Sequence, residues 1–374
     1  MKLELGKSIV IKIGSALLVD EAGEGIRRQW LAALASDIDA LRRNSQSGVV
    51  IVSSGAIAIG RRHLGLTDRA LKLEEKQAAA ATGQIRLAHA WQEALAQFGI
   101  TVAQILLTLE DTEDRRRHLN GRATMRTLLS LGVVPVINEN DTVATAEIRF
   151  GDNDRLAARV AQMMSADCLI LFSDIDGLYS SDPRRDPAAQ FIPVIKEITP
   201  EIMAMAGAAP VGYSSGGMVT KIAAAKIAVS AGCRMVIANG RSDHCLRDLM
   251  DGKSRHSLFQ PQAEPLTARK RWIAAHVKSA GRLVIDNGAV MALRQGKSLL
   301  SAGLVGVTGE FERGDLVEIC DQSQSLIGRG LVGYDAREAM LIRGCKTSGL
   351  RAALGYDGRG ELIHRDDLVM ESGE

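Results

Sequence analysis

The sequence predicts an α/β protein in which helices cover a mainly parallel sheet, followed by a small and mostly β second domain. Three observations support this fold class. From residue 8 to about residue 240, short apolar runs alternate with segments of helical periodicity. The runs are apolar over nearly their whole length, which is typical of strands covered on both faces. Beyond a polar stretch at 251–270, the runs become short and alternating.

In the first domain, predicted strands and helices alternate. The strands are expected at 8–13, 48–52, 101–107, 133–137, 168–172 and 234–238. The helices are expected at 26–43, 74–98, 114–130, 153–164 and 217–231. Such alternation gives a mainly parallel sheet, in which ligands bind beyond the carboxyl ends of the strands. The polar residues that follow the strands are therefore the candidate site, and 142–150 is expected to form a small polar excursion over it.

The second domain is predicted from short runs at 283–286, 304–308, 316–320 and 326–334. Turn residues such as Asn287 and Gly288 separate these runs. The expected boundaries are 1–258 for the first domain, 259–279 for a linker and 280–360 for the second domain. The tail at 366–374 is expected to be loose.

Composition limits the class of protein. A chain of 374 residues is expected to form two domains, and a hydrophobic content of 46% is enough for a sizeable core. A net charge of +2 argues neither for nor against a nucleic-acid partner. The five cysteines have no CxxC spacing, so they predict neither zinc nor a redox pair, and free thiols fit a reducing cytosol. We expect no signal peptide and no membrane span.

Lys12 interrupts the first apolar run, just before Gly14 and Ser15. A lysine in a buried strand is costly unless an anion meets it, and a phosphate at the carboxyl end of the strand is a suitable partner. The alternative is an exposed lysine on an edge strand.

Gly216 and Gly217 precede a predicted helix that carries Lys221. Glycine lets backbone N–H groups approach phosphate oxygens, and the helix N-terminus attracts the same charge. Lys221 lies one turn into the helix, where it can contact the same group. The alternative is an ordinary glycine-rich helix start. The GxxxxGK[ST] loop is absent, so the usual P-loop enzyme is excluded.

Three further polar turns follow the predicted strands or precede the helices. The turn at 151–154 holds two carboxylates and an amide, which could bind Mg²⁺, orient lysines or cap the next helix. The turn at 138–141 offers donors and acceptors for a zwitterion. Ser54 and Gly55 offer a hydroxyl and N–H groups to a carboxylate. A loop or turn without a ligand is the alternative for each of the last two.

Together these motifs closely resemble the glutamate 5-kinase family of the amino acid kinase superfamily, in its long form with a C-terminal PUA domain. The resemblance covers about residues 8–360. It rests on the motifs at 53–58, 134–147, 151–154, 177–179, 182–184 and 216–221, and in the second domain on 296–300, 307–309 and 311–315. It implies the three-layer amino acid kinase fold, with a mainly parallel sheet covered by helices, and a small, mostly β PUA domain. Ser53 and Ser173 stand where the family commonly has Thr. Because serine and threonine both carry a hydroxyl, these two differences keep that group.

The resemblance implies transfer of the γ-phosphoryl group of ATP to the γ-carboxylate of L-glutamate, the first step of proline biosynthesis, with ATP and Mg²⁺ as cofactors. By position, Lys12 and Lys221 neutralise the transferring group, and Asp154 holds both lysines. The glutamate-binding positions are Ser54, Asn138, Asp141 and Asn153. The ATP-binding positions are Lys12, Gly14, Ser173, Asp174, Ser215, Gly216, Gly217, Met218, Val219, Thr220 and Lys221. The resemblance singles out no protein ligand for the metal.

The same resemblance implies proline as a feedback inhibitor, a glutamate-5-phosphate reductase as a possible partner and a homo-oligomer. The free cysteines predict a cytoplasmic location. Two alternatives remain at the level of sequence. One is another amino acid kinase, acting on aspartate or acetylglutamate, or a uridylate kinase. The other is a PUA-mediated RNA-binding regulator. The segment 138–141 and the PUA-like tail favour glutamate, whereas the near-neutral charge and the aromatic content of 3% give RNA binding little support.

Overall fold

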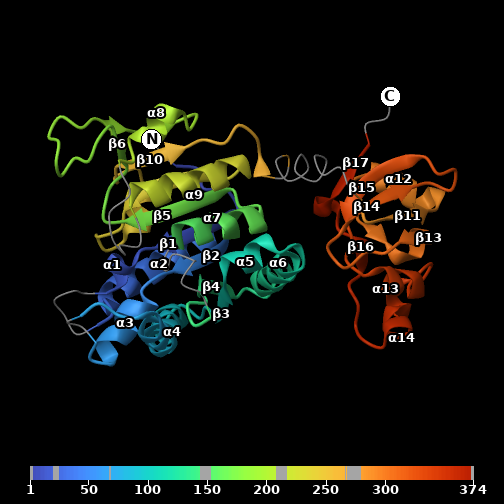
Figure 1. Cartoon of the computed structure of the whole chain (residues 1–374), viewed down its shortest axis with the longest axis horizontal. Helices are drawn as coiled ribbons and strands as arrows, with labels where there is room; N and C mark the ends of the chain where they lie inside the picture. Colours follow the sequence, from blue (N-terminus) through green and yellow to red (C-terminus); the bar gives the residue numbers. More distant parts are fainter. Residues whose placement is uncertain are drawn as a thin grey trace. The chain divides into compact units, whose positions relative to one another are not determined.

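The computed structural model describes residues 3–19, 25–66, 69–143, 153–207, 217–265, 267 and 279–371. The chain forms two compact units, of which the first comprises residues 1–114 and 120–265 and the second comprises residues 115–119 and 266–374 (Figure 1). The first unit contains a large sheet with helices on both faces, and the second contains a smaller sheet with short helices.

Eight strands form the sheet of the first unit, in the order β3-β4-β2-β1-β5-β9-β10-β8. They are β1 (Ser8–Ile13), β2 (Gly48–Ser53), β3 (Val102–Leu107), β4 (Val134–Glu139), β5 (Cys168–Ser173), β8 (Val194–Ile195), β9 (Arg234–Asn239) and β10 (His256–Phe259). All neighbouring pairs are parallel except β9 with β10. The predicted mainly parallel sheet is therefore confirmed. A separate antiparallel pair consists of β6 (Leu178–Tyr179) and β7 (Phe191–Ile192).

The helices of the first unit cover both faces of this sheet (Figure 1). They are α1 (Ser15–Leu18), α2 (Arg28–Ser45), α3 (Ala56–His63), α4 (Leu73–Ala96), α5 (Leu109–Glu113), α6 (Arg115–Ser130), α7 (Asn153–Met164), α8 (Pro200–Ala204), α9 (Met218–Ser230) and α10 (Cys245–Met250). The sequence did not predict α3, a short helix directly after the turn at Gly55. Among the described helices, none is long and apolar enough to cross a membrane.

Alternation of side chains along the strands decides which helices each residue meets. In β1, Ile9, Ile11 and Ile13 belong to the core under α2, α3, α4 and α10. Val10 belongs to the opposite core, under α6, α7 and α9. Because successive side chains in a strand point to opposite faces, Lys12 lies on the side of Val10, facing α7 and α9. The position of Lys12 in the sequence thus determines its partners.

Helices α3 and α4 pack with their backbones in direct contact, because glycines meet at the crossing. A Cβ atom added at Gly60 would lie 1.8 Å from the carbonyl oxygen of Ala79. A Cβ atom added at Gly83 would lie 1.8 Å from the carbonyl oxygen of Ala56. No side chain fits at either position, so glycine is required for this close approach. The contact fixes α4 relative to the turn at the end of β2, where α3 begins.

The second unit contains a five-stranded sheet in the order β13-β11-β14-β15-β17. Its elements are β11 (Gly281–Ile285), α12 (Asn287–Arg294), β12 (Leu299–Leu300), β13 (Leu304–Gly309), β14 (Leu316–Cys320), β15 (Leu326–Leu331), α13 (Ala336–Leu341), α14 (Leu350–Leu354), β16 (Glu361–Ile363) and β17 (Leu368–Met370), with 3₁₀ helices at Ser301–Gly303, Thr347–Gly349 and Arg365–Asp367. The expectation of a loose tail is wrong as far as residue 371. Strand β17 pairs with β15 and buries Leu368 in the core.

Candidate active site

The strand order places the predicted site residues along one edge of the sheet. In the sheet, β2 and β4 lie on one side of β1, and β5 lies on the other side, so the order of the strands reverses at β1. In open parallel sheets such a reversal marks the ligand crevice, at the carboxyl ends of the strands. Ser54 follows β2 and Asn138 lies near the end of β4, whereas Ser173 ends β5. Lys12, near the end of β1, therefore lies between the predicted glutamate positions and the predicted nucleotide positions.

Two lysines meet one carboxylate at the centre of this edge. The Nζ atom of Lys12 lies 2.6 Å from Oδ1 of Asp154, and Nζ of Lys221 donates to Oδ2 of Asp154 at 3.0 Å. Asp154 is at the start of α7 and Lys221 is in the first turn of α9, and these two helices lie side by side (Figure 1). All three side chains are at least nine-tenths buried. The cluster carries one positive charge in excess.

The ionisation of Asp154 follows from these contacts. Burial alone would raise the pKa of this carboxyl group, because a charge is poorly solvated in the interior. The two ammonium groups have the larger combined effect, through their charges and hydrogen bonds, and hold the pKa of Asp154 below its usual range. The hydroxyl of Thr220 also donates to Oδ2 at 3.0 Å. Asp154 is therefore an anion at neutral pH, and its two oxygens contact the two cations.

A network of amides lies on the glutamate side of Lys12. The Nδ2 atom of Asn153 donates to Oγ of Ser54 at 2.8 Å and to Oδ1 of Asn138 at 3.0 Å. Oδ1 of Asn138 also accepts from the backbone N–H of Glu139 at 2.9 Å, and its Nδ2 donates to Oε1 of Gln84 at 2.7 Å. The structure thus brings together three of the predicted glutamate positions, on β4, α7 and the turn after β2.

Gln84 was not predicted from the sequence. It lies in the buried stripe of α4, between Ala80 and Leu87. A polar residue inside such an apolar stripe is the signal that could have found it, because a buried amide needs a hydrogen-bond partner.

Asp141, the fourth predicted glutamate position, carries a buried acceptor. The residue is 7% exposed, and its Oδ1 atom has no hydrogen-bond partner among the described residues. The same holds for Oδ1 of Asn153. Burial, with the nearby charge of Glu139 as a second cause, raises the pKa of Asp141 to about 7. A positive donor group beside Asp141 would give its Oδ1 atom a partner and favour the ionised form of Asp141.

Ser173 and Asp174, two of the predicted nucleotide positions, lie at the end of β5, on the other side of β1 from β2. Oγ of Ser173 donates to Oδ1 of Asp174 at 3.1 Å, just beyond β5. Gly217 is the N-cap of α9, and its N–H donates to Oγ1 of Thr220 at 3.2 Å. Gly14 follows β1, and Met218 and Val219 form the first turn of α9 with half-buried side chains.

Ser215 and Gly216 lie outside the described residues, as do Gly151, Asp152 and the segment 144–150 of the expected excursion.

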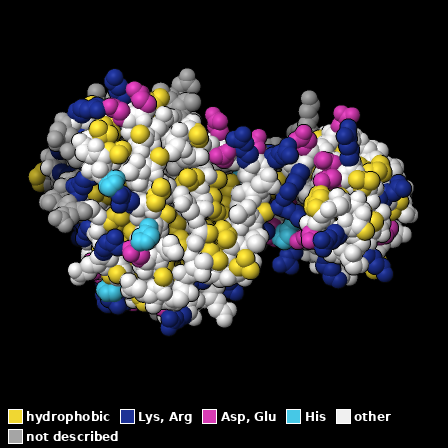
Figure 2. All heavy atoms as spheres, turned by 90° about the horizontal axis from the view of Figure 1, so that it is seen from below, with side chains coloured by type: hydrophobic (Ala, Val, Ile, Leu, Met, Phe, Trp, Pro, Cys, Tyr) yellow, Lys and Arg dark blue, Asp and Glu magenta, His cyan; other side chains and the backbone are white. Residues whose placement is uncertain are grey.

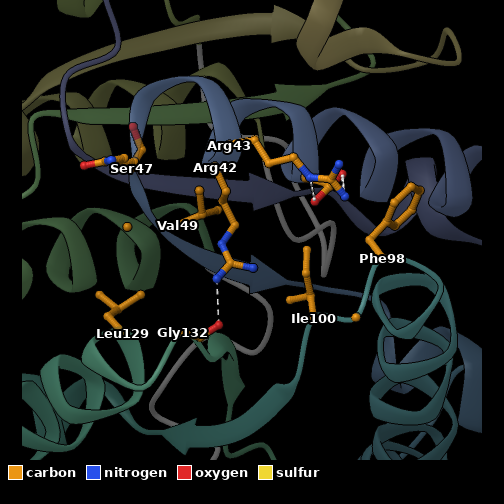
Figure 3. Close-up of a pocket in the computed structure, with 12 residues that line it drawn as sticks. Arg42, Arg43, Ser47, Val49, Phe98, Ile100, Leu129 and Gly132 are labelled. Carbon is orange, nitrogen blue, oxygen red and sulfur yellow. Dashed lines mark hydrogen bonds and ion pairs between the residues drawn. The ribbon is translucent and has the colours of Figure 1, made fainter.

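A cavity of about 450 Å³ lies at the opposite end of the strands (Figure 3). Val49 at the start of β2 and Ile100 before β3 line it. Its two arginines are engaged in the fold: Arg42 donates to the carbonyl oxygen of Gly132 at 2.6 Å, and Arg43 pairs with Asp39 at 2.9 Å. None of the predicted site residues lines this cavity, which is therefore distinct from the cluster of Lys12, Asp154 and Lys221 at the carboxyl edge.

Comparisons with known proteins bear on both units. Residues 7–239 match the amino acid kinase family, and residues 281–354 match the PUA domain. A protein of Paramagnetospirillum magneticum named glutamate 5-kinase is 62% identical over 369 residues, covering 99% of each chain. A glutamate 5-kinase of Rhodospirillum rubrum is 57% identical, covering 97% of this chain and 96% of its own. Glutamate 5-kinase 1 of Rhizobium meliloti is 59% identical, covering 98% of this chain and 93% of its own.

Proposed function

Because this chain belongs to the amino acid kinase family, and within it to the glutamate 5-kinases, it transfers the γ-phosphoryl group of ATP to L-glutamate, and we propose that Lys12, Asp154 and Lys221 promote that transfer. The product, L-glutamate 5-phosphate, is formed in the first step of proline biosynthesis. The observation that supports the proposed roles is the buried carboxylate held by two buried lysines at the carboxyl edge of the sheet.

The chemistry of the reaction explains why such a cluster is suitable. An oxygen of the γ-carboxylate forms a bond to the γ-phosphorus of ATP, and the bond from phosphorus to the bridging oxygen breaks, leaving its electron pair on ADP. The carboxylate is already a nucleophile, so no strong general base is needed. The obstacle is the approach of two anions, which positive charge and in-line positioning remove. Lys12 and Lys221 supply the positive charge, and Asp154 keeps both ammonium groups in place before ATP binds.

The strand order supports a division of the edge into two subsites. Glutamate is proposed to bind Ser54, Asn138, Asp141 and Asn153, on the side of β2 and β4. ATP is proposed to bind Lys12, Gly14, Ser173, Asp174 and residues 215–221, on the side of β5 and α9. The γ-phosphoryl group then lies over β1, where both substrates meet Lys12.

Mg²⁺ is proposed as the second cofactor, bound mainly by the phosphate oxygens of ATP. This is its usual mode in phosphoryl-transfer sites, because Mg²⁺ dehydrates reluctantly and favours phosphate and carboxylate oxygens. The excess positive charge of the lysine cluster suits an anionic nucleotide with its metal. When bound, the ion neutralises phosphate charge and orients the transferring group.

Asp141 is proposed to bind the α-ammonium group of glutamate, together with Oδ1 of Asn153. The variant Asp141→Asn is expected to raise the KM for glutamate at least about tenfold, because the ammonium group loses its negative counter-charge, and to change the KM for ATP little. Free Asp141 must release its proton to bind an ammonium group. With its pKa at about 7, kcat/KM for glutamate should fall as the pH decreases through 7.

This acidic limb of the pH profile should vanish in Asp141→Asn, which has no proton to release. Steady-state assays from pH 5.5 to 9, with glutamate and ATP varied separately, measure both effects. Equal increases in the two KM values, or an acidic limb that persists in the variant, would assign Asp141 a structural role.

Proline is proposed as a feedback inhibitor that competes with glutamate. It shares the ammonium and α-carboxylate groups of glutamate, but it has no γ-carboxylate to accept a phosphoryl group. Raising the glutamate concentration is therefore expected to relieve inhibition, and Asp141→Asn is expected to weaken it. Inhibition constants measured at several glutamate concentrations test this, and a constant degree of inhibition would place proline at another site.

We further propose a cytoplasmic homo-oligomer that passes its unstable acyl phosphate to a glutamate-5-phosphate reductase. Free thiols support the location, since all five cysteines are unpaired.

Catalysis is proposed for the domain at 1–258, joined through 259–279 to the PUA domain at 280–360. RNA binding is the alternative role for the PUA domain. Figure 2 gives it little support, because acidic side chains lie among the basic ones on the visible face of the second unit.

A further inference from the structure

The side chain of Gln84 extends from α4 to the glutamate side of the sheet edge. The residue is 8% exposed, and its Oε1 atom accepts a hydrogen bond from Nδ2 of Asn138 at 2.7 Å. Its neighbours in the buried stripe of α4 are apolar or glycine. A buried amide in such a stripe costs free energy unless it is hydrogen-bonded, so this contact offsets the cost of burying the Oε1 atom.

The hydrogen bonds around Asn138 determine how each amide is oriented. The backbone N–H of Glu139 can only donate, so the atom of Asn138 that faces it must be the oxygen. The other end of the Asn138 amide is then Nδ2, which needs an acceptor, and Gln84 provides one. Asn153 in turn presents its Nδ2 to Oδ1 of Asn138 and to Oγ of Ser54.

These hydrogen bonds leave Oδ1 of Asn153 without a partner. Both hydrogens of the Asn153 amide are used, and its Oδ1 atom is buried with no hydrogen-bond partner in the described part of the chain. Oδ1 of Asp141 has the same property. Each is an acceptor for a donor that a ligand brings.

We propose that Gln84 is a positioning residue for glutamate: the acceptor that it gives to Asn138 holds the amides of Asn138 and Asn153 so that Oδ1 of Asn153 is left for the substrate. The proposal rests on the proposed function, because it takes the unpartnered acceptors of Asp141 and Asn153 as the ammonium subsite. Gln84 itself contacts neither substrate in this scheme and acts through Asn138.

Helix α4 is held rigidly enough for this role. Gly83, directly before Gln84, lies against the backbone of α3 at Ala56, two residues beyond Ser54. Two turns further along α4, Nε1 of Trp91 donates to Oγ of Ser53 at 2.9 Å, and Trp91 is fully buried. Helix α4 is thus fixed to the end of β2 as well as to β4. Gln84 has little freedom to move away from Asn138.

The test compares two substitutions of Gln84 in the full-length enzyme. Gln84→Met keeps the size of the side chain but removes the acceptor, so the buried Nδ2 of Asn138 loses its partner. We expect the KM for glutamate to rise roughly tenfold, with a smaller change in kcat and in the KM for ATP. Gln84→Glu keeps an acceptor oxygen at the same reach and should retain most of the affinity. Gln92→Met, on the exposed face of α4, is the matched control and should behave like the unsubstituted enzyme.

Thermal unfolding of each variant separates this effect from a loss of folding. If Gln84→Met does not fold, Gln84→Asn can replace it, because the shorter side chain withdraws the amide by one methylene. We expect the same selective rise in the KM for glutamate. Equal glutamate KM values for Gln84→Met and the unsubstituted enzyme would overturn the proposal. An equal rise in the glutamate KM for Gln84→Met and Gln84→Glu would also overturn it. A normal glutamate KM in Asp141→Asn would instead contradict the ammonium subsite itself. The two failures are therefore distinguishable.

Discussion

Replacing Lys221 with alanine is expected to lower kcat by about 100-fold or more while the fold remains intact. The ammonium group is proposed to neutralise charge that grows on the transferring phosphoryl group, and such interactions contribute more in a buried site than in water. Alanine leaves Asp154 paired with Lys12, so no buried charge loses all its partners. The KM values should change less than kcat, because the interaction strengthens in the transition state.

Lys226 provides a matched control for this prediction. It lies on the same helix, α9, with an exposed side chain, so Lys226→Ala removes the same charge outside the site. Single-turnover measurements of phosphoryl transfer, with thermal unfolding curves for both variants, separate chemistry from stability. Near-normal turnover in a folded Lys221→Ala enzyme would remove Lys221 from the catalytic group. Lys12→Ala is expected to behave like Lys221→Ala, because Lys12 contacts the other oxygen of the same carboxylate.

Asp154→Asn is expected to abolish most activity and also to destabilise the enzyme, unlike the lysine variants. The amide keeps the shape of the side chain but leaves two buried ammonium groups without a counter-charge. Removing one partner of a buried ion pair typically costs roughly 3–5 kcal/mol. Thermal or denaturant unfolding should therefore show a clear loss of stability for Asp154→Asn and a smaller one for Lys221→Ala. The opposite order of stabilities would argue against Asp154 as the shared anchor.

The pH dependence of stability gives a second test of Asp154. Its pKa in the folded protein lies below the usual value, so the unfolded chain binds the proton more readily. The stabilisation from this carboxylate is therefore fully present at neutral pH. It is lost only as the pH falls below the ordinary carboxyl pKa of about 4. Acid unfolding of the unsubstituted enzyme should show this contribution below pH 4, and Asp154→Asn should lack it.

The sequence by itself determined the alternation of strands and helices in the first unit. Apolar runs covered on both faces are distinctive, because few other structures tolerate them, and β1 follows its predicted bounds from Ser8 to Ile13. The helices α7 and α9 begin within one residue of their predicted starts for similar reasons. The sequence also identified the polar residues after the strands, since a parallel sheet brings those ends to one edge.

Short elements and distant pairings were not determined in this way. Helix α3 has only 8 residues, too few for a clear helical period. Strand β17 has only 3 residues, and its place in the sheet depends on pairing with β15 rather than on its own composition. Such segments are stabilised by their neighbours in space, so their sequence carries little local signal.

Only the tertiary structure decided which polar groups meet. The residues alone left Asp154 open as a metal ligand, a helix cap or a partner of lysines, and strand order with helix packing brought it to Lys12 and Lys221. Asp154 and Lys221 are separated by 67 residues, and Gln84 and Asn138 by 54. The pattern along the chain reports how far each segment is buried. A hydrogen bond or ion pair depends on distances of about 3 Å, which are set only when separate helices pack on the same sheet.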